Sequence, residues 1–342
     1  MCLKNRYYPL VRTPLGKQKI LFQYGLTVDN REAFDELQKI KNGVISFMEG
    51  SPGEEDIETG EIKQFDFVKM VSVPCGMCRE CLTDNSRQWA FRILKEAEEH
   101  DDNWFITFTY DDDHIPDNGM LDEKAISNFN KKLKAALNRA GLDSTFRFYG
   151  VGEYGGQTAR PHYHVIFFGL PIPDLKFICK SSEGNLIFDS NFIKNVWKNG
   201  FITIEGVSIG SASYVARYCD KKKRLNKLEK QELRDKGIVP EFARMSNRPG
   251  IGASYLDTAV EKFKDGIYNS YVNGKSYSFP LYYNKKIKQL LIDDESLLKY
   301  DEYANLKSTA KIFENMELSD RVGSVYNYNE YIDKLYKSKR KL

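Results

Sequence analysis

PHYHVIFF, at residues 161–168, is the strongest strand signal in this chain. Aromatic and β-branched residues fill it, and its proline stands at the entry, where a missing N–H does least harm to a sheet. Successive side chains of a strand point to opposite faces, so His162 and His164 share one face. We therefore predict a strand that carries a histidine pair.

Regular elements are predicted on both sides of this strand. Strands are expected at 104–110, 145–151 and 201–204, and helices at 122–140, 189–200 and 211–224. Asp122 can cap the first helix, and Gly141 can stop it. The order β-α-β-β-α-β, followed by a further helix, is typical of a ferredoxin-like or RRM-like α+β fold, in which helices flank a central antiparallel sheet. The stretch between Gly169 and Asp189 is expected to be an irregular insertion.

The length of 342 residues favours two domains, or one domain with a long extension. We predict three parts. Residues 1–100 form an N-terminal segment with a cysteine cluster and a helix that packs on the core, residues 101–225 form the core, and residues 226–342 form a C-terminal extension of helices and a hairpin with a basic tail. The Asn273-Gly274 pair predicts the turn of that hairpin.

Composition excludes several classes of protein. No apolar run approaches the roughly 18 residues of a membrane helix, and no secretory signal follows Met1. Six cysteines are too few for a disulfide scaffold, so a reducing compartment is expected. Net charge is only +3, but residues 217–236 carry nine bases and four acids. Such a patch favours a bound polyanion, although a solvated helix face explains any single patch as well.

The histidine pair is a candidate metal site. The Cα atoms of His162 and His164 should lie about 6.5–7 Å apart, so that both rings reach one ion. Glu153, placed at the turn before His162, could add a carboxylate. Two imidazoles and a carboxylate can bind Mg²⁺, Mn²⁺, Zn²⁺ or Fe²⁺, and these ligands do not choose among them. A satisfied core histidine and a polar turn residue are the plain alternatives.

Two tyrosines in the helix at 211–224 are candidate nucleophiles. Tyr214 and Tyr218 are four residues apart and share a helix face, and Lys221 follows one turn later. A nearby cation or metal-bound group stabilises a tyrosine oxyanion, which activates it for transesterification at a phosphodiester. The alternative is that both tyrosines pack in the core and that the lysines are solvated.

Three cysteines form a candidate structural zinc site at Cys75, Cys78 and Cys81. Closed zinc sites usually have four ligands, for which Cys2 is the preferred fourth, followed by Cys219 or Cys179. Otherwise these are free, redox-reactive thiols at a helix start.

Three motifs together resemble the HUH endonucleases. PHYHVIFF resembles their His-hydrophobic-His motif, YVARYCDK at 214–221 their tyrosine motif in its two-tyrosine form, and WFITFTY at 104–110 their first strand. More narrowly, Cys2, the segment 73–92 and RPGIG at 248–252 are similar to the replication initiators of gokushovirus-type microviruses, which are small single-stranded DNA phages. The resemblance covers most of residues 1–285.

The resemblance implies an enzyme that nicks and rejoins one DNA strand at an origin through a 5′-phosphotyrosine link, which starts rolling-circle replication. It implies Mg²⁺ or Mn²⁺ on His162, His164 and Glu153, and nucleophilic tyrosines at 214 and 218 with Lys221 beside them. The residues expected to contact DNA are Arg217, Lys222, Lys223 and Arg224. The expected partners are phage replicative-form and single-stranded DNA, a host helicase and a host DNA polymerase in the bacterial cytoplasm, with no membrane and no small-molecule substrate.

Three other functions remain open at this point. A relaxase or transposase of the same superfamily would act on different DNA. A non-catalytic single-strand binder on an RRM-like sheet would have no need of metal ligands. An iron oxygenase would use the histidines and Glu153 but would leave the tyrosine-lysine helix unexplained.

Overall fold

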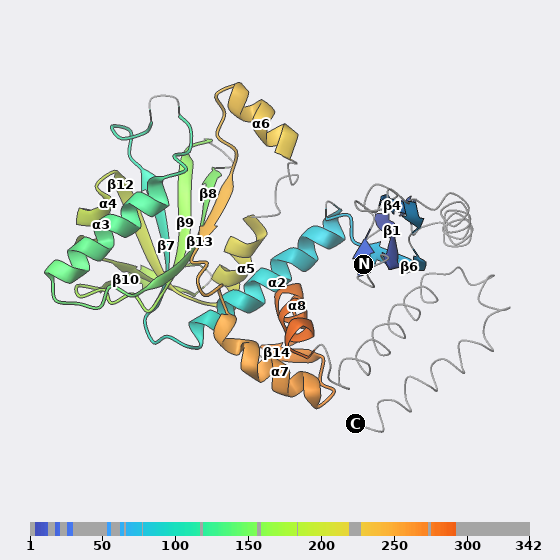
Figure 1. Cartoon of the computed structure of the whole chain (residues 1–342). Coiled ribbons are helices and arrows are strands. Elements are labelled where there is room, and N and C mark those ends of the chain that lie inside the picture. The colour runs from blue at the N-terminus through green and yellow to red at the C-terminus, as the bar shows by residue number, and fades with distance from the viewer. Residues whose placement is uncertain are drawn as a thin grey trace. The chain divides into compact units, whose positions relative to one another are not determined.

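The structure is a computed structural model that describes residues 4–12, 18–20, 26–29, 53–55, 62–64, 66–76, 78–116, 119–155, 159–182, 184–218, 227–272 and 275–291. It divides into two compact units. The first comprises residues 1–82 with 294–342, and the second comprises residues 83–293. Each unit is described by itself, with its elements labelled in Figure 1.

The first unit contains a four-stranded antiparallel sheet built on β1 (Lys4–Arg12). β2 (Gln18–Ile20), β3 (Leu26–Asp29) and β6 (Asp66–Val73) all pair with β1. The strand predicted at residues 67–73 is thereby confirmed as β6. A separate pair joins β4 (Gly53–Glu55) to β5 (Ile62–Gln64).

The second unit contains a seven-stranded antiparallel sheet in the order β10-β11-β12-β7-β9-β8-β13. Its strands are β7 (Asn103–Tyr110), β8 (Arg147–Tyr154), β9 (Pro161–Phe168), β10 (Lys176–Lys180), β11 (Leu186–Asp189), β12 (Gly200–Gly206) and β13 (Phe242–Met245). The α+β class and the four strands predicted at 104–110, 145–151, 161–168 and 201–204 are confirmed. The histidine strand β9 lies between β7 and β8.

Helices pack on both faces of this sheet. On one face α3 (Ala125–Arg139) and α4 (Asn191–Trp197) cover a core in which Phe108 and Phe167 are buried. On the other face α2 (Arg79–Ala97) and α5 (Ile209–Tyr218) cover a second core around Phe105 and Ile166. The two pairs of helices lie on opposite sides of the strands in Figure 1.

Helix boundaries differ slightly from the predicted ones. α3 begins at Ala125 because the Asp122 carboxylate accepts from the backbone N–H of Lys124, 2.8 Å away, and so closes a turn before the helix. α5 begins at Ile209, since Ser208 and Ser211 each accept a hydrogen bond from the other's backbone N–H. Its predicted extension to Arg224 lies outside the described residues. Ser190 caps α4 as predicted, by accepting from the N–H of Ile193.

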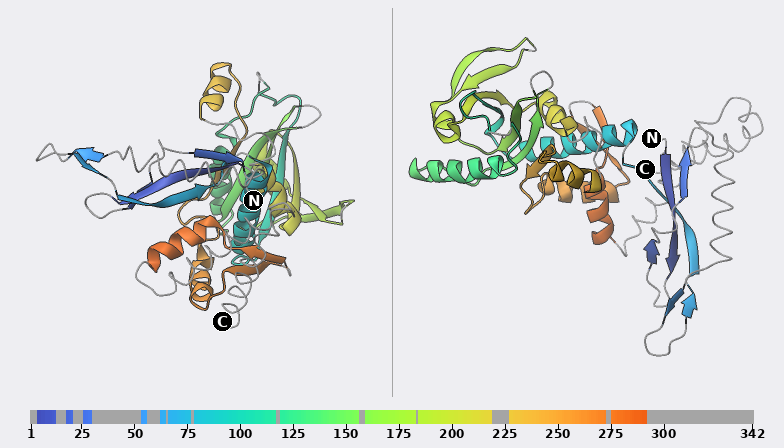
Figure 2. Two further views of the ribbon diagram at one scale, coloured as in Figure 1. Left: turned by 90° about the vertical axis from the view of Figure 1, so that its right-hand side faces the viewer. Right: turned by 90° about the horizontal axis from the view of Figure 1, so that it is seen from above.

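The stretch between Gly169 and Asp189 is not an irregular insertion. It contains the β10–β11 hairpin, which pairs with the free edge of β12 and lengthens the sheet by two strands. Figure 2 shows this hairpin projecting from the rest of the unit. The interpretation was wrong because a polar turn between short strands resembles a loop in sequence, whereas pairing with β12 supplies hydrogen bonds that the local pattern does not reveal.

The chain after α5 adds further elements to the second unit. They are α6 (Lys227–Asp235), β13 beside β8, the 3₁₀ turn η2 (Ala253–Tyr255), α7 (Leu256–Lys264), the paired strands β14 (Asn269–Val272) and β15 (Lys275–Ser278), and α8 (Leu281–Leu290). The predicted hairpin around residues 273–274 is confirmed by the pairing of β14 with β15. Within the described ranges, no helix has the length and apolar character needed to cross a membrane.

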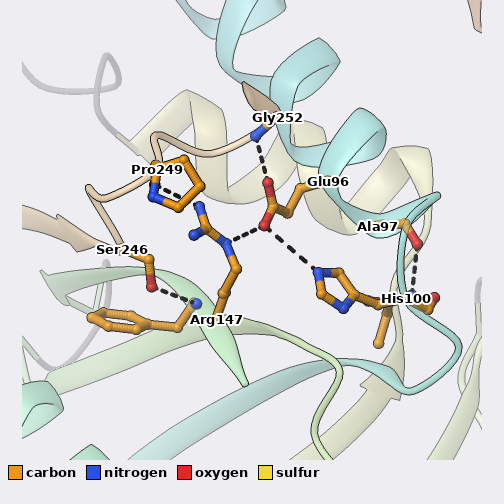
Figure 3. Close-up of polar contacts among 9 residues, drawn as sticks. Glu96, Ala97, His100, Arg147, Ser246, Pro249 and Gly252 are labelled. Atoms are coloured by element: carbon orange, nitrogen blue, oxygen red, sulfur yellow. Dashed lines mark hydrogen bonds and ion pairs between the residues drawn. The ribbon is translucent and has the colours of Figure 1, made fainter. Parts of the chain in front are cut away.

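A buried carboxylate ties the RPGIG segment to the sheet (Figure 3). Glu96 of α2 accepts hydrogen bonds from the Arg147 guanidinium of β8 and, at 2.6 Å, from the backbone N–H of Gly252. Arg147 also donates to the Pro249 carbonyl, 2.7 Å away. The segment thereby holds the fully buried Ile251 in the same core as α5. This network fixes the floor on which α5 lies.

Candidate active site and metal centre

One face of the sheet gathers the predicted ligands. In the paired register, Glu153 of β8 lies directly opposite His162 of β9, and Thr109 of β7 lies on the other side of His162. The next row places His164 between Val151 and Thr107. Directly opposed residues of antiparallel strands point to the same face, here the face covered by α5. Glu153 is therefore a strand residue, which corrects its predicted position in a turn; β8 continues past the predicted end because β9 and β13 pair with it on both sides.

His164 is buried and held by hydrogen bonds at both ring nitrogens. Its Nε2 lies 2.8 Å from a Glu153 carboxylate oxygen, and its Nδ1 lies 2.9 Å from the Thr107 hydroxyl. The ring also stacks on Phe105, with centroids 5.8 Å apart and planes at 16°. His164 is thus fixed in position and in orientation, as outer hydrogen-bond partners fix a metal-binding histidine.

His162 is half-buried and its Nδ1 is buried without a hydrogen-bond partner. Burial, then the neighbouring His164, lowers its pKa below the ordinary value, while Glu153 opposes the shift. A lowered pKa keeps this imidazole neutral at pH 7, which is the form that binds a metal. An unpaired buried nitrogen beside a carboxylate and a second imidazole fits a divalent cation in its chemistry.

The three ligand groups are not drawn together around one point. The rings of His162 and His164 have centroids 6.5 Å apart, and Glu153 is bonded to His164. Among the described residues, the group of three or more potential ligands whose atoms all lie within 4.8 Å of one another is the cysteine cluster. The histidine site therefore has suitable donors on one face, and its ligand set stays a prediction.

Tyr214 brings α5 to this site. Its ring meets the His164 ring edge-on, with centroids 5.2 Å apart and planes at 82°, and it also contacts Phe105. Tyr214 is partly buried and packs on the second core. Tyr218 ends the helix one turn later, and its side chain lies outside the described residues. Sequence reasoning thus placed at least one candidate nucleophile beside the histidine strand.

The predicted basic residues are described only in part. Arg217 is exposed in the last turn of α5. Lys221, Lys222, Lys223 and Arg224 lie outside the described residues. Their contacts with a tyrosine or with DNA stay predictions.

The cysteine cluster is assembled in the first unit. The Sγ atoms of Cys75 and Cys81 lie 4.0 Å apart, and the backbone N–H of Cys78 donates to Cys75 Sγ at 3.3 Å. A tetrahedral zinc with Zn–S bonds of about 2.3 Å separates its sulfurs by about 3.8 Å, so the cluster has the right size to bind a metal. Gly76, with φ of 72°, makes the turn between the first two cysteines. The preferred fourth ligand, Cys2, and one alternative, Cys219, lie outside the described residues, whereas Cys179 is exposed in β10.

Two neighbours of His164 were missed by sequence reasoning. Thr107 bonds to Nδ1 of His164, and Phe105 stacks on its ring. Both lie at alternate positions of the strand that precedes α3, and alternation alone could have placed them on one face. Nothing in the local pattern reveals that this face of β7 adjoins the histidines.

Comparison with known proteins agrees with this fold and candidate site. The family model of the replication-associated protein ORF2 matches residues 103–223, from the first strand of the second sheet to just beyond α5. The chain is 31% identical to the replication-associated protein ORF2 of Spiroplasma virus 4 over 287 residues, which are 80% of this chain and 85% of that protein. It is 32% identical to the replication-associated protein VP4 of Bdellovibrio phage phiMH2K, over 75% of this chain and 80% of that protein.

A third relative is the replication-associated protein ORF4 of Chlamydia phage 1, 28% identical over 68% of this chain and 57% of that protein. The chain belongs to the family of the replication-associated protein ORF2. The resemblance to phage replication proteins is thereby confirmed. No solved structure matches the chain.

Proposed function

We propose that this protein is an HUH-type nickase and joining enzyme that initiates rolling-circle replication of a small phage genome. The observation that carries the proposal is the position of His164, which bonds to Glu153 and Thr107 while Tyr214 of α5 lies against its ring. The central strand order β12-β7-β9-β8, built from a β-α-β-β-α-β chain order, supports a ferredoxin-like HUH core. Family membership supports a replication protein that acts on DNA.

The proposed reaction is a transesterification at phosphorus. A tyrosine oxygen attacks the scissile phosphate, a tyrosine–phosphorus bond forms, and the bond to the 3′ oxygen breaks. The leaving oxygen takes a proton and becomes the 3′-OH, while the 5′ end stays linked to the enzyme. His162, His164 and Glu153 would hold Mg²⁺ or Mn²⁺, which when bound polarises the phosphate as a Lewis acid.

Joining requires a second hydroxyl. The first tyrosine is still linked to DNA when the next cleavage is due, so a single nucleophile would be blocked. Tyr214 and Tyr218 are one helical turn apart, about 6 Å by rise, and could alternate at one phosphate. We propose Tyr218 as the first nucleophile, with Lys221 favouring its phenolate form. Arg217, Lys222, Lys223 and Arg224 would hold the DNA backbone.

The three-part organisation is proposed in functional terms. Residues 101–225 would carry the reaction, with residues 1–100 and 226–342 as supporting and DNA-binding extensions. Single-stranded and replicative-form phage DNA would be the substrates, and a host helicase and a host polymerase would use the 3′-OH in the host cytoplasm. One structural Zn²⁺ at Cys75, Cys78 and Cys81 would stabilise the segment that leads into α2.

The decisive test is a denaturing gel of a labelled origin strand incubated with the full chain and Mg²⁺ or Mn²⁺. We expect a cleaved product and a protein–DNA adduct that survives boiling in detergent. His164→Ala should abolish both, whereas His114→Ala, at an exposed histidine of the loop after β7, should leave both unchanged. Retained single-strand binding without any adduct would favour the non-catalytic binder instead.

A further inference from the structure

Phe201 is a large aromatic side chain that the sheet leaves in solvent. It is 66% exposed, while its neighbours Ile202 and Ile204 pack into the core under α3 and α4. Because side chains alternate along a strand, Phe201 projects from the opposite face to Ile204, the one that carries the histidines. Single exposed apolar side chains are common on proteins, so exposure alone assigns no role.

The register gives Phe201 a particular position. Phe201 of β12 lies directly opposite Thr109 of β7, which lies opposite His162 of β9, which lies opposite Glu153 of β8. These four residues therefore form one row across four adjacent strands, on one face. With neighbouring strands about 4.8 Å apart, the Cα atoms of Phe201 and His162 are about 10 Å apart.

The backbone holds this end of β12 firmly. Gly200 has a φ of 136°, and a Cβ there would lie 2.3 Å from the backbone N of Asp111 and 2.5 Å from the carbonyl O of Thr109. Only glycine allows this close approach, so β12 begins tightly against the end of β7. The Phe201 ring thus extends from a rigid strand and not from a loop.

Small side chains line the surface between Phe201 and the candidate site. Thr107, Thr109 and Thr203 lie on this face and are only partly buried. Short hydroxyl side chains leave the sheet shallow there, beside a projecting aromatic ring. An exposed ring that adjoins a phosphate-handling site is the arrangement on which an unpaired base can stack.

We infer that Phe201 is a positioning residue that stacks on an unpaired base of single-stranded DNA next to the phosphate held at His162. This inference rests on the proposed function, because it takes the histidine row as the place of the scissile phosphate. Stacking on Phe201 would set which phosphate of the strand reaches the tyrosines. It would also favour melted over duplex DNA, since a paired base has no free face to offer.

The test measures binding separately from cleavage. The probe is an oligothymidylate about ten nucleotides long with one central 2-aminopurine, bound to the full chain in EDTA. We expect Phe201→Ala to weaken binding about 5- to 100-fold and to abolish stacking-dependent quenching of the aminopurine, while Phe201→Trp retains both. Affinity for the matched duplex should be the same in all variants.

Phe177→Ala is the matched control. Phe177 is 52% exposed in β10 and pairs with Phe188, whose partner Ile204 faces the core under α3 and α4, so it lies on the opposite face of the same sheet. Its replacement should leave single-strand affinity and quenching unchanged. Circular dichroism should show all variants folded, as expected for exposed side chains.

The outcomes separate this inference from the proposed function. Wild-type affinity and quenching in Phe201→Ala would overturn the stacking role even if the wild-type enzyme forms its covalent adduct. Weakened single-strand binding in Phe201→Ala, together with no adduct from the wild type, would support stacking and overturn the nickase. An equal loss in Phe177→Ala would also overturn the inference, because it would indicate a general loss of apolar surface.

Discussion

Tyr214 presents the edge of its ring to the face of the system that His164 forms with Phe105, and the centroids of Tyr214 and His164 are 5.2 Å apart. Two elements that are distant in the sequence meet at this contact, the strand β9 and the helix α5. It places a hydroxyl-bearing side chain on the sheet face that holds a buried histidine–carboxylate pair. Every prediction about the reaction depends on this one juxtaposition.

We expect Thr107→Val to weaken binding of Mn²⁺. The Thr107 hydroxyl bonds to Nδ1 of His164 and so fixes which ring nitrogen is left for an ion. Loss of such a partner typically weakens metal affinity about 10- to 100-fold. Isothermal titration with Mn²⁺ measures it directly. Thr203→Val is the control, because Thr203 lies opposite Thr107 on the same face, one strand further from the histidines; an equal effect of both variants would refute the role of Thr107.

We expect Tyr214→Phe and Tyr218→Phe each to retain some cleavage of a short oligonucleotide and to fail in the coupled cleavage and joining that release unit circles. The Tyr214 replacement keeps the ring contacts with His164 and Phe105, so the fold should be unaffected. The double variant should form no covalent adduct on a denaturing gel. Tyr271→Phe, at an exposed tyrosine of β14, should behave as wild type.

If Tyr214→Phe releases circles at the wild-type rate, alternation of the two tyrosines is wrong. Tyr214 would then be a packing residue that supports His164, which is the plain alternative that its partial burial already allows.

We expect purified protein to carry about one zinc per chain, held by the thiolates of the cysteine cluster. Elemental analysis in reducing buffer measures the zinc, and a chelator should lower the melting temperature. Cys81→Ser and Cys2→Ser should both reduce the zinc content, whereas Cys179→Ser, at the exposed cysteine of β10, should not. Wild-type protein free of zinc would exclude the structural site.

We expect Arg147→Met to destabilise the fold by about 3 kcal/mol, because it leaves the buried Glu96 carboxylate without its charged partner. The surface pair of Arg234 with Glu123 provides the control, and Arg234→Met should cost about 0–1 kcal/mol. Urea unfolding measures both. Equal costs for the two variants would show that the network in Figure 3 adds nothing beyond a surface ion pair.

Local patterns predicted much of the second unit. Alternation identified the strands at 104–110 and 161–168 and placed both histidines on one face, and helical spacing identified α3. Cysteine spacing identified a cluster whose sulfurs do lie together. These features succeed because each depends on residues close in sequence, whose geometry follows from the repeat of a strand or a helix.

Only the tertiary structure decided how separate strands pair. The register sets Glu153 opposite His162, brings Thr107 to His164 and aligns Phe201 with the same row. A shift of one residue would have turned each of these side chains to the other face, and local periodicity is the same in either register. The choice is made by burial of the two apolar faces beneath α3 with α4 and beneath α2 with α5, which involves the whole unit at once.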